Sequence, residues 1–203
     1  MKSLAELEKI RNNTYGEIAL RLGDTEHAAP GLKGNILCCG GTGCTSSGCQ
    51  AIINEMEAQL KAHGLDDQYK VIKTGCFGLC ALGPIMIVYP EGAFYSRITA
   101  QNVKQIVEEH LIGGNVVKDL LYEETVDGDD IKSLQETRFY AKQHRVALRN
   151  CGVISPEHIE EYIARDGYKA LYKALTSMSR EEVIDEILKS GLRGRGGGGF
   201  PTG

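Results

Sequence analysis

The spacing of four cysteines constrains this 203-residue chain more than any other feature. Cys39 and Cys44 are separated by four residues, and Cys76 and Cys80 by three. Each pair follows a short apolar run typical of a β-strand, and a helix and a second strand lie between the pairs. Two short-spaced pairs on neighbouring loops can bring four thiolates to one point. The pattern therefore predicts a metal centre.

The composition fits this interpretation. The chain has seven cysteines, and charges at Lys2, Glu6, Glu8 and Lys9 prevent the apolar core of a secretory signal. The sequence also lacks a run of about 20 apolar residues that could span a membrane. We therefore expect a cytoplasmic protein, in which spaced cysteines indicate metal or redox chemistry rather than disulfides. The net charge of −4, without a basic cluster, argues against nucleic-acid binding.

The hydrophobic pattern predicts a small α/β domain with the order β–α–β–β–β–α. The expected strands are 35–39, 69–75, 85–90 and 93–99, with a hairpin turn at Glu91-Gly92. One expected helix ends at Gly64, and the last is capped by Thr99 and ends at Gly113.

The flanking segments read as helical. Ser3 with Glu6 forms a capping box for a first helix, and Ser179 with Glu182 forms one for a helix that ends at Gly191. Ser155-Pro156 predicts another helix start, with a shorter helix around 168–175. Two apolar stripes are expected to face inward, namely Ile159, Tyr162 and Ile163, and Val183, Ile184, Ile187 and Leu188. The sequence predicts four divisions. They are an N-terminal helix and lead-in (1–32), the α/β domain (33–113), a linker (114–150) and a helical end (151–203).

Residue chemistry alone leaves alternatives for the cysteines. Four thiolates can also hold a structural zinc ion, whereas a redox dithiol is disfavoured because neither chosen pair has the C-x-x-C spacing. Cys49 lies five residues beyond Cys44 and competes for a ligand position. Cys38 should point away from Cys39 in an extended strand, and Cys151 reads as a small buried residue.

The segments CGGTGCTSSG and TGCFGLCALGPIMIVYPEG resemble the thioredoxin-like [2Fe–2S] ferredoxins, including the 24-kDa-type subunit of respiratory complex I. The resemblance covers about residues 33–115. It implies a thioredoxin-like fold, a [2Fe–2S] cluster, and Cys39, Cys44, Cys76 and Cys80 as its ligands. Cys49 is not among the ligands that it implies.

The glycine-rich end GRGGGGF contains Gly194-x-Gly196-x-x-Gly199, but it follows a helix and not a strand, so it is not a Rossmann fingerprint. It is not a phosphate-binding P-loop either, because no Gly-Lys-Ser/Thr sequence follows the glycines. A flexible tail is one interpretation. The alternative is a binding loop, because glycine N–H groups and the fork of Arg195 can contact phosphate and Phe200 can stack on a ring.

The stretch from about residue 145 to 203 resembles the start of the flavin-binding, 51-kDa-type subunit of NADH dehydrogenases. The resemblance implies that an FMN-binding domain begins here. The cofactor-binding residues that it implies are Gly194, Arg195, Gly196, Gly197, Gly199 and Phe200. Of these, Gly194, Arg195 and Gly196 would approach FMN, and Phe200 would line the NAD(H) site.

The order of the two modules resembles the beta subunits of bifurcating and NAD(P)-reducing [FeFe] hydrogenases. Members of that family continue for several hundred residues, so we expect this chain to be a fragment. The resemblance implies electron transfer within an NAD(P)H-linked flavoprotein complex of several subunits. A formate dehydrogenase or complex I-type subunit remains an alternative, as does a zinc-stabilised interaction domain of a different class. The chain by itself is expected to transfer electrons only, and no general acid, base or nucleophile stands out.

Overall fold

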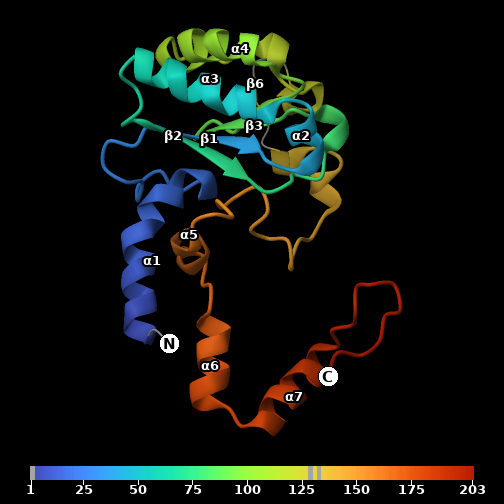
Figure 1. The fold of residues 1–203 in the computed structure, drawn as a ribbon. Coiled ribbons are helices and arrows are strands. Elements are labelled where there is room, and N and C mark those ends of the chain that lie inside the picture. Colours follow the sequence, from blue (N-terminus) through green and yellow to red (C-terminus); the bar gives the residue numbers. More distant parts are fainter. Residues whose placement is uncertain (1–2, 128–129, 132–133) are drawn as a thin grey trace.

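A four-stranded sheet forms the centre of the computed structural model, which describes residues 3–127, 130–131 and 134–203 (Figure 1). Its strands run in the order β2-β1-β3-β4. The central strand β1 is parallel to β2 and antiparallel to β3, and β3 and β4 form an antiparallel hairpin. The bounds are β1 Gly34–Cys39, β2 Tyr69–Thr74, β3 Met86–Tyr89 and β4 Ala93–Tyr95. The predicted order of strands and helices is confirmed.

Two helical segments cover one face of the sheet (Figure 1). Helix α3, Cys49–Ala62, connects β1 to β2, and its apolar side is buried as its period predicts, with Ile52, Ile53, Met56 and Leu60 inward. Helix α4, Ala100–Gln105, lies beside α3. Thr99 caps its start, and the Thr99 backbone N–H donates to the Asn102 side chain at 2.8 Å. The helix then widens into a π-helical segment, η3 Ile106–Ile112, before Gly113. A regular α-helix was predicted here, but in the wider turns of this segment the buried residues are Ile106, Val107 and His110.

The N-terminal segment reaches the other side of the sheet through η1, whereas α1 extends away from the sheet and packs beside α5, Ile159–Ala164 (Figure 1). Helix α1, Leu4–Ile18, starts at the predicted cap, where the Glu6 backbone N–H donates to the Ser3 hydroxyl at 3.2 Å. The short helix η1, Ala19–Leu22, then brings Arg21 beneath the sheet.

Arg21 forms a buried ion pair with Glu161, a residue 140 positions later in the chain. Their closest atoms, Nη1 and Oε2, are 2.6 Å apart, and Arg21 Nε also donates to Asn35 Oδ1 at 2.9 Å. Glu161 accepts a further bond from the Ser155 backbone N–H at 2.7 Å. Because each buried charge is paired and hydrogen-bonded, the network joins the two ends of the chain to β1 without an uncompensated charge.

Residues beyond 113 also pack on the sheet domain. The Ser96 backbone N–H donates to Leu120 O at 3.1 Å, and the Tyr122 N–H donates to Phe94 O at 3.0 Å, so this segment lies beside β4. Its buried side chains join the main core, namely Val117, Leu121, Leu134 and Tyr140. Its short elements are η4 Lys118–Leu120, η5 Glu123–Thr125, β5 Val126–Asp127, β6 Asp130–Ile131, η6 Leu134–Glu136 and η7 Tyr140–Lys142. Residues 128–129 and 132–133 of the predicted linker lie outside the described residues, and the domain boundaries stay predictions.

Three helices follow, α5 Ile159–Ala164, α6 Lys169–Ser177 and α7 Arg180–Ser190. Helix α5 begins later than the sequence predicts, because the Ser155 hydroxyl accepts from the Glu157 N–H in a local turn. Of its predicted inward stripe only Ile163 is buried, whereas Ile159 and Tyr162 are exposed. The stripe predicted for α7 is wrong as well, since α7 has no buried residue. Within the described residues, none of the helices has the length and apolar content to cross a membrane.

Candidate metal centre

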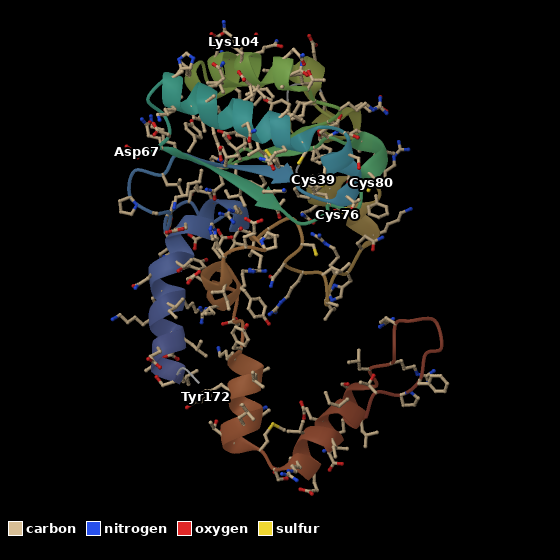
Figure 2. All side chains as sticks on the ribbon, viewed as in Figure 1. Cys39, Asp67, Cys76, Cys80, Lys104 and Tyr172 are labelled. Carbon is tan, nitrogen blue, oxygen red and sulfur yellow. The ribbon has the colours of Figure 1, made fainter. Side chains whose placement is uncertain are left out.

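The two cysteine pairs lie at the same end of the sheet. Cys39 is the last residue of β1, and Cys44 lies in the short helix α2, Thr42–Ser46. Cys76 and Cys80 follow β2, the parallel neighbour of β1. Figure 2 shows Cys39, Cys76 and Cys80 together beyond the ends of these strands. The sequence predicted that the two loops would meet, and the parallel pairing of β1 with β2 brings both loops to the same end of the sheet.

Two glycines show how closely the loops approach each other. A Cβ atom on Gly41 would stand 2.9 Å from Cys76 Cβ, and one on Gly83 would stand 2.8 Å from Cys44 Sγ. Both distances are too short for a side chain, so glycine is required for the loops to reach each other. The first loop is therefore in contact with the second pair of cysteines, and the second loop with the first pair.

Each thiol pair has neighbours that affect its pKa values. Burial, together with a hydrogen bond to Cys39, raises the pKa of Cys44 to about 12. A hydrogen bond to Cys76 raises the pKa of Cys80, although both thiols of this pair are exposed. A thiol that coordinates a metal is deprotonated, so metal binding at these cysteines would release their protons.

The four cysteines offer sulfur ligands alone to a metal centre. Among the described residues, no three His, Cys, Asp or Glu side chains are already arranged to hold one metal ion. The two cysteine pairs, which approach each other at Gly41 and Gly83, suit a centre with four thiolate ligands. The donor chemistry, four thiols and no carboxylate, is that of iron–sulfur sites and of structural zinc sites.

The other cysteines have different surroundings. Cys49 is buried at the start of α3, where burial raises its pKa. Cys38 is buried as well, and burial followed by the proximity of Cys49 raises its pKa. Cys151 is half-buried in the segment before α5, and its carbonyl accepts from Arg145 Nη1 at 3.1 Å.

Residues far along the chain hold the second cysteine loop. Thr74 Oγ1 donates to Ile154 O at 3.0 Å, and the buried ring of Phe77 fills the space where Gly152 has no side chain. The Tyr140 hydroxyl donates to the carbonyl oxygen of Phe77, and burial raises the pKa of that hydroxyl. Sequence reasoning missed these contacts because no local pattern links positions more than 60 residues apart.

The glycine-rich end forms a closed loop beyond α7, far from Cys39, Cys76 and Cys80 (Figure 2). The Gly194 N–H donates to Phe200 O at 2.8 Å, and the Thr202 N–H donates to Leu192 O at 3.1 Å. Arg195 is exposed, and Phe200 is 78% exposed. The glycine segment therefore has an ordered closure, but neither its arginine nor its aromatic ring packs into a pocket.

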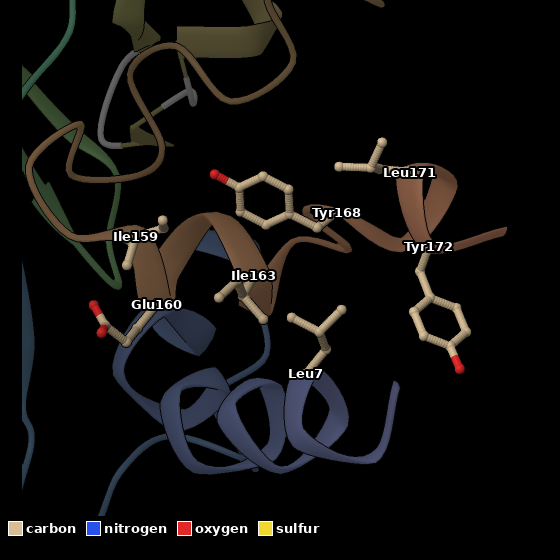
Figure 3. A pocket seen from close by; sticks show the side chains of 7 residues that line it. All are labelled: Leu7, Ile159, Glu160, Ile163, Tyr168, Leu171 and Tyr172. Atoms are coloured by element: carbon tan, nitrogen blue, oxygen red, sulfur yellow. The ribbon is translucent and has the colours of Figure 1, made fainter. Parts of the chain in front are cut away.

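An apolar cavity of about 290 Å³ lies between α1, α5 and α6 (Figure 3). Leu7, Ile163 and Leu171 supply much of its wall, with Tyr168 and Tyr172 at the α6 side. Glu160 is the one carboxylate among its lining residues, so the cavity lacks the convergent polar groups of a catalytic site.

This architecture is an α/β fold with two cysteine loops at one end of its sheet. It defines the class of iron–sulfur proteins built on a thioredoxin-like fold. Comparison with known families agrees, because the thioredoxin-like [2Fe–2S] ferredoxin family matches residues 26–111. A 2Fe-2S ferredoxin from Clostridium pasteurianum is 43% identical over 77 residues, which are 38% of this chain and 76% of that protein. The chain belongs to the thioredoxin-like [2Fe–2S] ferredoxin family.

Other relatives are much longer than the part that they share with this chain. The NADP-reducing hydrogenase subunit HndC of Solidesulfovibrio fructosivorans is 61% identical over 62 residues, 30% of this chain and 12% of that protein. A subunit of the NADH-quinone oxidoreductase of Aquifex aeolicus is 64% identical over 45 residues, 22% of this chain and 10% of that protein. The chain thus spans about a tenth of each of these two relatives.

Proposed function

We propose that this chain transfers single electrons through a [2Fe–2S] cluster held by Cys39, Cys44, Cys76 and Cys80. The observation that carries the proposal is the meeting of the two thiol pairs. Gly41 and Gly83 each lie where any side chain would strike a cysteine of the opposite pair. Each cysteine loop directly follows a strand of the sheet, so a rigid scaffold holds both loops.

The two cysteine pairs have different roles, because one holds the cluster in the protein and the other leaves it accessible to solvent. Cys39 and Cys44 are buried at the core side, whereas Cys76 and Cys80 are exposed. The bound cluster supplies the one-electron chemistry that amino-acid side chains lack. The second pair therefore offers the edge at which electrons enter and leave, and the first pair anchors the cluster to β1 and α2.

The wider role follows from the longer relatives, whose names include an NADP-reducing hydrogenase subunit and an NADH-quinone oxidoreductase subunit. We propose that the chain is part of an NAD(P)H-linked, cytoplasmic oxidoreductase complex. Within it Gly194, Arg195, Gly196, Gly197, Gly199 and Phe200 would contribute to a site for FMN and NAD(P)H. Other subunits of a hydrogenase or dehydrogenase would be its partners. The exposed apolar side chains of α6 and α7 support this, because the surface of a partner in such a complex would cover them.

The experiment that tests the cluster is iron and acid-labile sulfide analysis of anaerobically purified protein, with its visible spectrum. We expect equal amounts of iron and sulfide, two of each per chain for a [2Fe–2S] cluster, and absorption between about 400 and 600 nm. A colourless protein with one zinc ion per chain would instead establish the competing role of a zinc-stabilised interaction domain, which four thiols also permit.

A further inference from the structure

A hydrogen-bond relay links Tyr140 to the sulfur of Cys76. The first bond runs from the Tyr140 hydroxyl to the carbonyl oxygen of Phe77. The second runs from the backbone N–H of Gly78 to Cys76 Sγ, with N and S 3.2 Å apart. The Phe77 carbonyl and the Gly78 N–H belong to the same peptide unit, which is planar and rigid. Tyr140 therefore acts on the Cys76 sulfur through a single peptide group.

Packing fixes the tyrosine and the Phe77 side of the peptide in this relay. Tyr140 is 4% exposed and the guanidinium carbon of Arg145 stands 4.7 Å from the centre of its ring. Phe77 is buried, with its ring in the space left by Gly152, whose φ of +74° also favours glycine. These contacts come from residues beyond the part that matches the ferredoxin family, which ends at 111. The tyrosine that begins the relay therefore lies outside the part of the chain that matches the ferredoxin family.

Resting on the function proposed above, we propose that Tyr140 is a positioning residue that sets the reduction potential of the cluster through the Phe77–Gly78 peptide. Hydrogen bonds to cluster sulfurs are one of the levers by which proteins tune this potential. A donor on the Phe77 carbonyl polarises the peptide and strengthens its N–H as a donor to sulfur. Because reduction adds a negative charge to the cluster and its thiolates, a stronger N–H donor favours the reduced form.

The test compares two tyrosine-to-phenylalanine variants. Tyr140→Phe keeps the ring and removes the hydroxyl that begins the relay. Tyr69→Phe is the matched control, since the Tyr69 hydroxyl also donates to a backbone carbonyl, that of Leu111 at 3.2 Å. Tyr69 begins β2, whereas the cysteine loop follows the end of that strand.

Midpoint potentials are measured on the whole chain by titration with dithionite and mediators, followed by the EPR signal of the reduced cluster. We expect a more negative potential for Tyr140→Phe and an unchanged one for Tyr69→Phe. Only loaded molecules give the signal, so a variant with reduced iron content still reports its potential. Equal potentials in Tyr140→Phe and wild type, or a shift to less negative values, would overturn the relay. Absence of a [2Fe–2S] signal in the wild type would overturn the proposed function itself.

Discussion

The sheet domain and the C-terminal helices use the same local signals, yet they differ in what they bury. Thr99 begins α4 and Ser179 begins α7, each with a partner three residues later. Around α4 the core is continuous, and Met86, Phe94 and Ile106 are fully buried in it. Helices α6 and α7 have no buried residue, and Leu175 is 61% exposed. Capping thus sets where a helix begins, whereas burial depends on what the rest of the protein brings to its apolar side.

The largest difference between the two regions should appear when the cluster site is broken. Cys80→Ala leaves three of the four proposed ligands, so we expect loss of the normal cluster and a looser fold over residues 33–113. Cys49→Ala and Cys151→Ala should keep iron near the wild-type amount. Iron analysis and visible absorption provide the measurement. Retention of the cluster in Cys44→Ala together with its loss in Cys49→Ala would show that the proposed ligand set is wrong.

Core truncation should separate the regions next. Phe94→Ala removes a fully buried ring and should lower the free energy of unfolding by about 3–5 kcal/mol. Leu175→Ala removes an exposed side chain on α6, and we expect a change within about 0.5 kcal/mol. Urea unfolding followed by circular dichroism gives both values. Similar losses in the two variants would mean that α6 is packed as firmly as the sheet.

Trypsin should distinguish firmly packed from exposed segments. Lys142 and Arg149 lie in the exposed stretch before α5, and Arg193 and Arg195 lie in the glycine-rich loop. We expect the first cuts at these positions and persistence of a fragment that contains residues 34–112, because exposed irregular segments are cleaved most readily. Mass spectrometry of a time course identifies the fragments. Early cuts within 40–110 would contradict the proposed extent of the domain.

The smallest effect is expected from flavin. The loop from Gly194 to Gly199 can offer N–H donors to a phosphate, but Phe200 is 78% exposed, so the loop does not bury a flavin ring. Ordering the loop further on binding costs about 1–2 kcal/mol for each backbone residue fixed. A titration of this chain with FMN, followed by flavin fluorescence, should show no saturation below millimolar concentration. Micromolar binding would show that the glycine segment forms a sufficient site alone.

Much of this molecule follows from local sequence. The strands and helices of the sheet domain, the caps at Ser3 and Ser179, and the placing of Cys39 and Cys76 after parallel neighbours were all predictable. Each depends on hydrophobic period or on hydrogen bonds between residues close in the chain. Capping bonds form within one turn of a helix, and the hydrophobic period marks which segments can become strands or helices, so the sequence alone was sufficient to predict them.

Other features were decided by tertiary structure. The Arg21–Glu161 ion pair, the packing of Val117 and Leu121 on the sheet domain, and the contact of Tyr140 with Phe77 join residues far apart in sequence. Their positions depend on how the chain returns to the sheet. The apolar residues of α7 show the converse, since their period predicts burial while their surroundings leave them exposed. Periodicity identifies which side of a helix can be buried, and only the packed structure supplies the surface that covers it.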